Sequence, residues 1–194
     1  MDNVCRIVVV TPTYNERGNL SEFIEKILAL DFHSLELVIV DDNSPDGTGD
    51  LADQFATKHP QLISVIHRPT KLGLRSAYRC GFQYAMESGA EIIIQMDTDL
   101  SHSPEDIPVL VRKLDSADVV IGSRYIKGGG LDDSWSFLRR YLSYLGNLYI
   151  RLIGGIDVHD GTSGFKAFRR AVLDKVDFST FRCYGFGFQA EFTR

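Results

Sequence analysis

The stretch Ile-Ile-Ile-Gln-Met-Asp-Thr-Asp-Leu-Ser-His, residues 92–102, joins a short apolar run to two aspartates. The run Ile92–Met96 is typical of a strand that is buried on both faces of a sheet. In an extended segment, residues i and i+2 point the same way, so Asp97 and Asp99 would share one side of the strand end. Two carboxylates placed in this way repel each other unless a cation joins them, and their hard oxygens suit Mg²⁺ or Mn²⁺. This stretch therefore predicts a buried strand with a metal site at its end.

Four other short apolar runs occur along the chain, at Arg6–Val10, Leu35–Val40, Leu62–Ile66 and Val119–Ile121. Most are rich in Val and Ile and nearly continuous, as in strands covered on both faces. Between these runs, apolar residues recur at the spacing of a helix. Asn19 is the expected N-cap of one helix, Gly89 the C-cap of another and Ser103 the N-cap of a third. This alternation predicts an α/β fold with a mostly parallel central sheet flanked by helices.

The composition narrows the class of protein. The chain has 194 residues, of which 44% are hydrophobic and 24% charged, as in an ordinary globular domain. Its formal net charge of −5 argues against a nucleic-acid partner. Three scattered cysteines match neither a disulfide framework nor a zinc site. We see no signal peptide and no apolar stretch of the ~20 residues that a membrane helix needs, so we expect a soluble, cytoplasmic protein.

Polar segments follow four of the predicted strands, at Thr11–Glu16, Asp41–Gly47, Asp97–His102 and Gly122–Tyr125. Ligands of open α/β sheets bind beyond the carboxyl ends of the strands, so these segments predict one shared site. The alternative is ordinary turn chemistry, because Asp, Asn, Pro and Gly dominate turns. The first segment lacks the glycines of a dinucleotide-binding turn, and the chain has no Gly-x-x-x-x-Gly-Lys. Dinucleotide-binding and P-loop proteins are therefore excluded.

Several further side chains are candidates for binding anions or the metal. Ser101 or His102 would add a metal ligand or a water-mediated contact. Arg124 follows a buried strand, and its guanidinium would either hold a phosphate bidentately or close the strand end with an ion pair. Arg139 and Arg140 belong either to a solvated helix face or to a site for a second, acceptor anion.

With these residues identified, the chain resembles the family-2 glycosyltransferases with the GT-A fold. Within them it is most similar to the dolichyl- or polyprenyl-phosphate mannose synthases. The likeness runs through nearly the whole chain in the right order. It is carried by Pro12-Thr-Tyr14-Asn15-Glu16, Asp41-Asp42-Asn-Ser-Pro-Asp-Gly-Thr48, Met96-Asp97-Thr98-Asp99-Leu-Ser101-His102, Gly122-Ser-Arg124-Tyr125, Asp160-Gly-Thr-Ser163-Gly-Phe165 and Tyr184-Gly-Phe-Gly-Phe-Gln189.

The resemblance implies a role for particular residues of this chain. The groups that would bind the nucleotide sugar are Pro12, Tyr14, Glu16, Asp41, Asp42, Asp97, Thr98, Asp99, Ser101 and Arg124. Asp99 would be the principal ligand of Mg²⁺ or Mn²⁺, with Asp97 and Ser101 beside it. The acceptor would lie near Ser163 and Lys166, and the catalytic set would be Asp99, Arg124, Arg139 and Arg140. Thr98 stands where the family usually has Ala.

The implied activity is an inverting, metal-dependent transfer of mannose from GDP-mannose to a polyprenyl or dolichyl phosphate. One alternative keeps the fold and uses UDP-glucose or another UDP-sugar. Another alternative is a non-catalytic nucleotide-sugar-binding subunit. A phosphate acceptor is already largely a dianion at neutral pH, so it needs no general base. We therefore expect an Asp160→Asn variant to keep substantial activity.

The resemblance also implies a domain organisation and a location. Residues 1–194 would form one catalytic domain, with a nucleotide-sugar half at 1–124 and an acceptor half at 125–194. The chain stops inside an expected helix, so we expect the acceptor half to continue past Arg194. The predicted helix Leu138–Leu152 would either lie on an anionic membrane surface or pack in the core. We expect a cytoplasmic protein, peripheral at the cytosolic face of a membrane.

Overall fold

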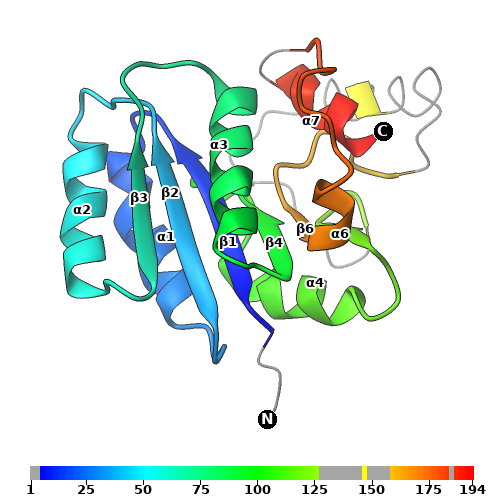
Figure 1. Cartoon of the computed structure of the whole chain (residues 1–194), viewed down its shortest axis with the longest axis horizontal. Coiled ribbons are helices and arrows are strands. Elements are labelled where there is room, and N and C mark those ends of the chain that lie inside the picture. Colours follow the sequence, from blue (N-terminus) through cyan, green and yellow to red (C-terminus); the bar gives the residue numbers. More distant parts are fainter. Residues whose placement is uncertain (1–4, 127–145, 148–157, 184–185) are drawn as a thin grey trace.

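A computed structural model describes residues 5–126, 146–147, 158–183 and 186–194 of the chain. It contains a six-stranded sheet in the order β3-β2-β1-β4-β6-β5, with helices against both faces (Figure 1). The strands are β1 (Ile7–Thr13), β2 (Leu35–Asp41), β3 (Ile63–His67), β4 (Ile92–Gln95), β5 (Val119–Ile121) and β6 (Lys166–Arg169). The predicted α/β fold is confirmed.

The sheet is parallel across β3, β2, β1 and β4, and antiparallel on both sides of β6. Because β6 runs against both β4 and β5, those two strands point the same way. No apolar run predicts β6, which lies between β4 and β5 and so joins the second half of the chain to the sheet of the first half. The strand is only four residues long, Lys-Ala-Phe-Arg, and has a cation at each end, so it lacks an apolar run.

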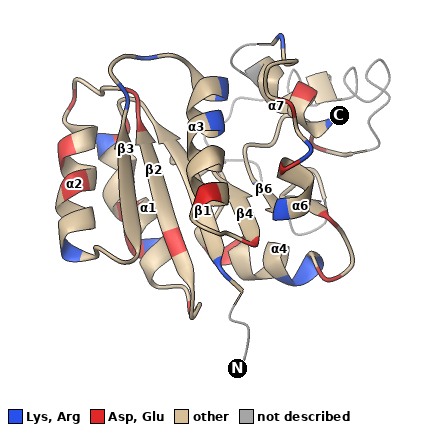
Figure 2. Cartoon of the chain, viewed as in Figure 1, with Lys and Arg blue, Asp and Glu red and all other residues tan. Residues whose placement is uncertain are grey.

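Two helical layers cover the sheet. Helices α1 (Arg17–Leu28), α2 (Thr48–Lys58) and α4 (Ile107–Lys113) pack against one face, where α1 and α4 contribute Phe23, Ile24, Ile107 and Leu110 to one buried cluster. Helices α3 (Leu74–Glu87), α6 (Arg170–Leu173) and α7 (Phe186–Thr193) cover the other face. A short 3₁₀ helix, η1 (Pro104–Asp106), precedes α4. Figure 2 shows acidic and basic residues interspersed on the outer helices.

The helix ends test three predictions. Ser103 is the N-cap of η1 with proline next to it, so that prediction is confirmed. The predicted C-cap at Gly89 is one residue late, because α3 has Ser88 as its C-cap and Gly89 follows it with a φ of 84°. The predicted cap at Asn19 is wrong, because α1 begins at Arg17 with Glu16 as its N-cap. The backbone N–H of Arg17 donates to Asp46 Oδ2 over 3.2 Å, which anchors the helix start to the next loop. Asn19 lies in the first turn and donates its amide to Glu16 Oε2 over 2.9 Å.

Helix α3 lies directly against β1. Gly81 makes this approach possible, because a Cβ there would overlap Cγ1 of Val10. Because the backbone of α3 packs closely on β1, the first turns of the helix lie over the carboxyl end of the sheet (Figure 1). This packing therefore determines the position of the Tyr78 side chain, which lies three residues before Gly81 in the same helix.

In the described part of the chain, no helix is both long enough and apolar enough to cross a membrane.

Candidate active site

The candidate site lies where the order of the strands reverses. The chain passes from β1 to β2 and β3 on one side, then crosses to β4 on the other side of β1. In open α/β sheets such a reversal leaves a crevice beyond the carboxyl ends of the two central strands. Strand β1 continues through Thr13, so Tyr14–Glu16 and Asp97–His102 follow β1 and β4 at this edge, where the polar strand ends predict a shared site.

Strained backbone gathers at the same edge. In the described part of the chain, the non-glycine residues with positive φ are Asn15 at 61°, Asn43 at 56° and Leu100 at 57°. They follow β1, β2 and β4 respectively. Asparagine tolerates this conformation, but leucine rarely adopts it, and such a residue costs on the order of 1–3 kcal/mol. Strain of this kind is typical of functional sites, and Leu100 is the neighbour of Asp99.

The loops after β1 and β2 are bonded into a single wall. The backbone N–H of Asn15 donates to Ser44 Oγ over 3.1 Å, and that of Glu16 donates to Thr48 Oγ1 over 3.0 Å. The hydroxyls of Ser44 and Thr48 therefore have a structural role, because they bind the backbone of the loop after β1. The wall presents the side chains of Pro12, Tyr14 and Glu16, which are all partly accessible.

The two aspartates at the end of β2, Asp41 in the strand and Asp42 just after it, bind the chain itself. Asp41 is buried and accepts hydrogen bonds from the Thr13 hydroxyl over 3.0 Å and from the Ser44 N–H over 3.0 Å. Asp42 is also buried; it pairs with Arg68 and accepts the N–H of Leu72 over 3.2 Å. Both carboxylates therefore fix loops around the crevice. Their predicted contact with a nucleotide base stays a prediction.

Lys71 lies beside the predicted site residue Tyr14, a contact that sequence reasoning missed. Its ammonium lies 3.7 Å from the centre of the Tyr14 ring, where a cation is attracted to the aromatic face. The two residues are far apart in sequence, and the bonds of the loop after β3 to Asp42 bring them together. No local sequence pattern signals this pairing.

Asp97 and Asp99 occupy different environments. Strand β4 ends at Gln95, so both aspartates lie just beyond it, and their predicted shared side stays a prediction. Asp97 is largely enclosed, and its Oδ1 accepts a hydrogen bond from the Tyr78 hydroxyl over 2.5 Å. Burial raises the pKa of Asp97 to about 6, and the charge of Asp99 acts in the same direction. Asp99 is exposed, and its Oδ1 accepts the Ser101 N–H over 3.0 Å.

Thr98, between the two aspartates, is buried and turned into the sheet. Its hydroxyl lies 2.8 Å from that of Thr11 at the end of β1. This contact ties the β4 loop to β1, an interaction that alanine could not make. The predicted contact of Thr98 with the nucleotide sugar stays a prediction.

The donor atoms present suit a hard divalent cation. Carboxylate oxygens fit Mg²⁺ or Mn²⁺, which typically bind through one or two carboxylates together with substrate phosphates and water. Within the described ranges, no cluster of three or more His, Cys, Asp or Glu side chains could hold a metal by itself. A cation at the exposed Asp99 would therefore need oxygens from a bound diphosphate. Ser101 is half-buried beside it.

Arg124 makes a buried ion pair at the end of β5. Its Nε donates to Asp160 Oδ2 over 2.8 Å, and its Nη2 donates to Oδ1 over 2.9 Å. Of the two interpretations of Arg124, the structure shows the ion pair. Burial raises the pKa of Asp160, but the hydrogen bonds and charge of Arg124 outweigh it and hold that pKa below its usual value of 3.8. A carboxylate with so low a pKa is a poor general base near pH 7.

Ser163 and His102 join the β4 loop to the segment before β6. The Ser163 hydroxyl has a single proton, which it donates to the Gly122 carbonyl over 2.6 Å. His102 Nε2, 3.3 Å from the same oxygen, is therefore the donor of that contact. Burial, then the charge of Arg124, lowers the pKa of His102 to about 4, so the ring is neutral near pH 7. The predicted acceptor contact of Ser163 stays a prediction.

Lys166 lies inside the protein. Its Nζ is fully buried and donates to Gln189 Oε1 on α7 over 2.7 Å; Gln95 Nε2 donates to the same oxygen over 2.5 Å. Burial lowers the pKa of Lys166 to about 7, against the opposing charges of Asp97 and Asp160. The side chain therefore ties β6 to α7, and its predicted contact with the acceptor stays a prediction.

Lys166→Met is expected to stabilise the protein most at and below neutral pH. The pKa of Lys166 falls from 10.5 in the unfolded chain to about 7 in the fold, so burying the cation costs free energy that accumulates as the pH drops between those values. Methionine removes this cost. Thermal melts of both proteins across this pH range should show the advantage of Lys166→Met shrinking as the pH rises. A constant difference would contradict the buried, shifted lysine.

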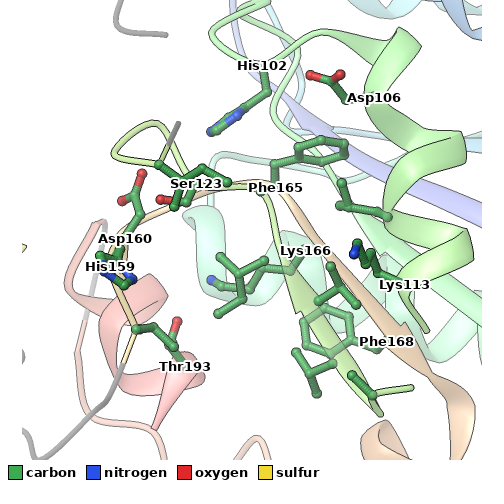
Figure 3. A pocket seen from close by; sticks show the side chains of 18 of the residues that line it. His102, Asp106, Lys113, Ser123, His159, Asp160, Phe165, Lys166, Phe168 and Thr193 are labelled. Atoms are coloured by element: carbon green, nitrogen blue, oxygen red, sulfur yellow. The ribbon is translucent and has the colours of Figure 1, made fainter. Parts of the chain in front are cut away.

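A cavity of about 1140 Å³ lies beside the crevice, along β5 and β6. Figure 3 shows His102, Ser123 and Asp160 at one end and Lys113 and Phe168 toward the other. Its residues include Ser101 and Arg124 but neither Asp97 nor Asp99, so the cavity adjoins the aspartates without containing them.

Some predicted site residues lie outside the described residues. These are Arg139 and Arg140 with most of the predicted helix Leu138–Leu152, and Tyr184 with Gly185 in the last segment of the resemblance.

Comparison with known proteins identifies relatives over most of the chain. The sequence profile "Glycosyl transferase family 2" matches residues 8–177. The polyprenol monophosphomannose synthase of Mycolicibacterium smegmatis is 41% identical over 97% of this chain and 71% of its own length. The undecaprenyl-phosphate mannosyltransferase of Micrococcus luteus is 39% identical over 97% of this chain and 76% of its own. The dolichol-phosphate mannosyltransferase of Pyrococcus furiosus is 39% identical over 89% of this chain and 48% of its own.

Solved structures resemble the chain at lower identity. The mannosyltransferase PcManGT from Pyrobaculum calidifontis, in complex with GDP-Man and Mn²⁺, has a TM-score of 0.62 and 22% identity over 88% of this chain and 46% of its own. Glucosyl-3-phosphoglycerate synthase from Mycobacterium tuberculosis, with Mn²⁺ and UDP-glucose, has a TM-score of 0.66 and 22% identity over 96% of this chain and 62% of its own. At this identity the likeness concerns the fold, and it confirms the fold predicted from the sequence.

Proposed function

We propose that this chain, which belongs to glycosyl transferase family 2, transfers mannose from GDP-mannose to a polyprenyl phosphate such as dolichyl phosphate. The transfer would invert the sugar's anomeric configuration and require Mg²⁺ or Mn²⁺. One observation carries the proposal: the exposed Asp99 carboxylate stands at the reversal of strand order, in a chain whose relatives at 39–41% identity are named for polyprenyl-linked mannosyl transfer.

In this proposal the wall after β1 and β2 receives the nucleotide. Tyr14 would offer its ring to the base, and Pro12 and Glu16 would line the same pocket. Asp41 and Asp42 hold the loops that shape it. Asp99 would bind the cation, which when present offsets the negative charge that develops on the leaving diphosphate.

The state of Asp160 supports a phosphate acceptor over a sugar hydroxyl. A hydroxyl nucleophile wants a base to take its proton, and the carboxylate of Asp160 is instead buried, bound by Arg124 and held at a low pKa. A phosphate monoester has its second pKa near ~6 and is already largely a dianion at neutral pH. Such a nucleophile needs cations that hold and orient it, and Arg139 and Arg140 are the proposed groups.

The cavity beside the crevice supports an acceptor that is partly apolar. Its polar end adjoins Arg124, and apolar surface comes from Val119 on β5, Phe168 on β6 and Phe192 on α7. We infer that the lipid phosphate approaches from this side. The reaction would then take place at a membrane surface, on its cytosolic face.

The test is a transfer assay with two donors and three acceptors. Purified protein receives radiolabelled GDP-mannose or UDP-glucose, together with a polyprenyl phosphate, the matching polyprenol or a free sugar. We expect labelled lipid only from GDP-mannose and the polyprenyl phosphate. Labelled product from UDP-glucose would assign a different donor, and equal use of the polyprenol would contradict the phosphate acceptor. Donor binding without any turnover would indicate a non-catalytic subunit.

A further inference from the structure

We propose that the hydroxyl of Tyr78 is a positioning group of the donor site. It holds the Asp97 carboxylate in the orientation that binding of a divalent cation and a nucleoside diphosphate at Asp99 requires. The inference rests on the proposed function, because it concerns the same donor site. Tyr78 itself touches neither substrate nor cation in this proposal, and it acts through Asp97.

The ring of Tyr78 is fixed independently of its hydroxyl. The side chain is fully buried on α3, with its ring centre 5.5 Å from that of Phe82 and 6.5 Å from that of Phe188 in near-parallel stacks. Phenylalanine would fill the same space in this aromatic cluster. Packing therefore accounts for an aromatic residue at position 78, but it does not account for the oxygen.

The hydroxyl has a specific partner at the site. A buried phenolic oxygen needs a hydrogen-bond partner, and this one donates to Asp97 Oδ1 over 2.5 Å. Hydrogen bonds to a charged acceptor are short and stronger than those between neutral groups. Because the ring is buried and stacked between two phenylalanines, the bond ties the carboxylate to a packed part of α3.

Asp97 is enclosed on its other side by backbone. A Cβ added to Gly164 would overlap Oδ2 of Asp97, so only glycine leaves room for the carboxylate in this position. Tyr78 and Gly164 come from α3 and from the segment before β6, two parts of the chain that meet only in the fold. Together they hold the Asp97 carboxylate between the hydroxyl of Tyr78 and the backbone of Gly164.

Holding Asp97 matters because Asp99 is two residues away on a strained turn. The two carboxylates repel each other, and Leu100 next to Asp99 has a φ of 57°. A carboxylate released from Tyr78 would be free to turn and would change both the charge and the geometry presented by the loop. Loss of such a supporting hydrogen bond typically costs about 10- to 100-fold in metal affinity or activity.

The experiment compares Tyr78→Phe with Tyr84→Phe. Tyr84 is a matched control on the same helix, since its hydroxyl donates to another carboxylate, Glu36 Oε1, over 3.0 Å on β2. We would measure the Mn²⁺ dissociation constant by electron paramagnetic resonance in the presence of GDP, and the melting temperature of each variant. We expect at least about 10-fold weaker Mn²⁺ binding in Tyr78→Phe and wild-type binding in Tyr84→Phe. Equal or tighter binding in Tyr78→Phe would overturn the proposal.

A second measurement separates positioning from general destabilisation. In an Asp97→Asn background, adding Tyr78→Phe should have little further effect on the Mn²⁺ dissociation constant, because the carboxylate that the hydroxyl holds is already gone. A further 10-fold weakening there would show that Tyr78 does not act through Asp97.

The outcomes also separate this inference from the proposed function. Wild-type protein that binds Mn²⁺ with GDP but transfers no mannose would contradict the function alone. Mannosyl transfer with identical Mn²⁺ binding in both tyrosine variants would contradict only the positioning role. Absence of Mn²⁺ binding by wild-type protein with GDP would overturn both.

Discussion

Asp99→Asn is expected to lower mannosyl transfer by about 10²- to 10³-fold while leaving the fold intact. The side chain is exposed at the strand reversal, so its replacement by an isosteric amide disturbs no packing. The amide is a weaker ligand for a hard cation, and the charge developing on the leaving diphosphate would lose its counter-charge. The measurement is kcat with GDP-mannose and a polyprenyl phosphate, together with a thermal melt.

The control for this prediction is Asp115→Asn, which changes an exposed carboxylate just beyond α4. We expect wild-type turnover from it. EDTA should silence the wild-type enzyme, and added Mn²⁺ or Mg²⁺ should restore it. Turnover near the wild-type level in Asp99→Asn, or full activity in EDTA, would contradict the metal assignment.

Asp160→Asn is expected to reduce the free energy of unfolding by about 3 kcal/mol, because it leaves the buried Arg124 without its partner. Asp160 is fully buried, and the side chain of Arg124 is only 13% exposed, so water screens the pair poorly. An amide also turns one acceptor of the bidentate pair into a donor facing the guanidinium. Urea denaturation at neutral pH would measure the loss. The sequence-based expectation that this variant keeps substantial activity is therefore replaced by one of weakened folding.

The matched control for Asp160→Asn is Asp174→Asn. Asp174 pairs with Arg170 over 3.6 Å on the surface, with both side chains about half exposed, so its loss should change stability little. The pH dependence adds a second check. Because the pKa of Asp160 is lowered in the fold, its contribution is present above the unfolded value of 3.8 and is lost as the pH falls through the lower folded value. An Asp160→Asn variant as stable as wild type would show that the pair contributes nothing.

The strands and the edge that holds the site followed from local sequence patterns. A nearly continuous apolar run predicts a strand, and five such runs were visible, although the edge strands β3 and β5 are only partly buried. The sheet's parallel part then places the carboxyl ends of its strands at one edge, where the polar segments converge. Strand β6 carried no such signal, since its four residues hold a cation at each end and acquire strand structure only by pairing between β4 and β5.

The spacing of Asp97 and Asp99 was visible in the sequence, but the burial and hydrogen bonding of each carboxylate were not. Spacing alone treated Asp97 and Asp99 as equivalent ligands, and the structure separates them into an enclosed and an exposed carboxylate. The difference arises because β4 ends before both of them, and because Tyr78 comes from the preceding helix. The same holds for Arg124, whose partner Asp160 lies 36 residues further along the chain.

The sequence by itself determined the α/β class and the polar strand ends, because periodicity and residue type are properties of short segments. Only the tertiary structure decided which carboxylates are buried and bonded and which is exposed. Desolvation and hydrogen bonding depend on neighbours in space, and those of Asp97 and Asp160 come from segments 19 and 36 residues away. The short-range rules that predict helices and strands contain no term for such neighbours.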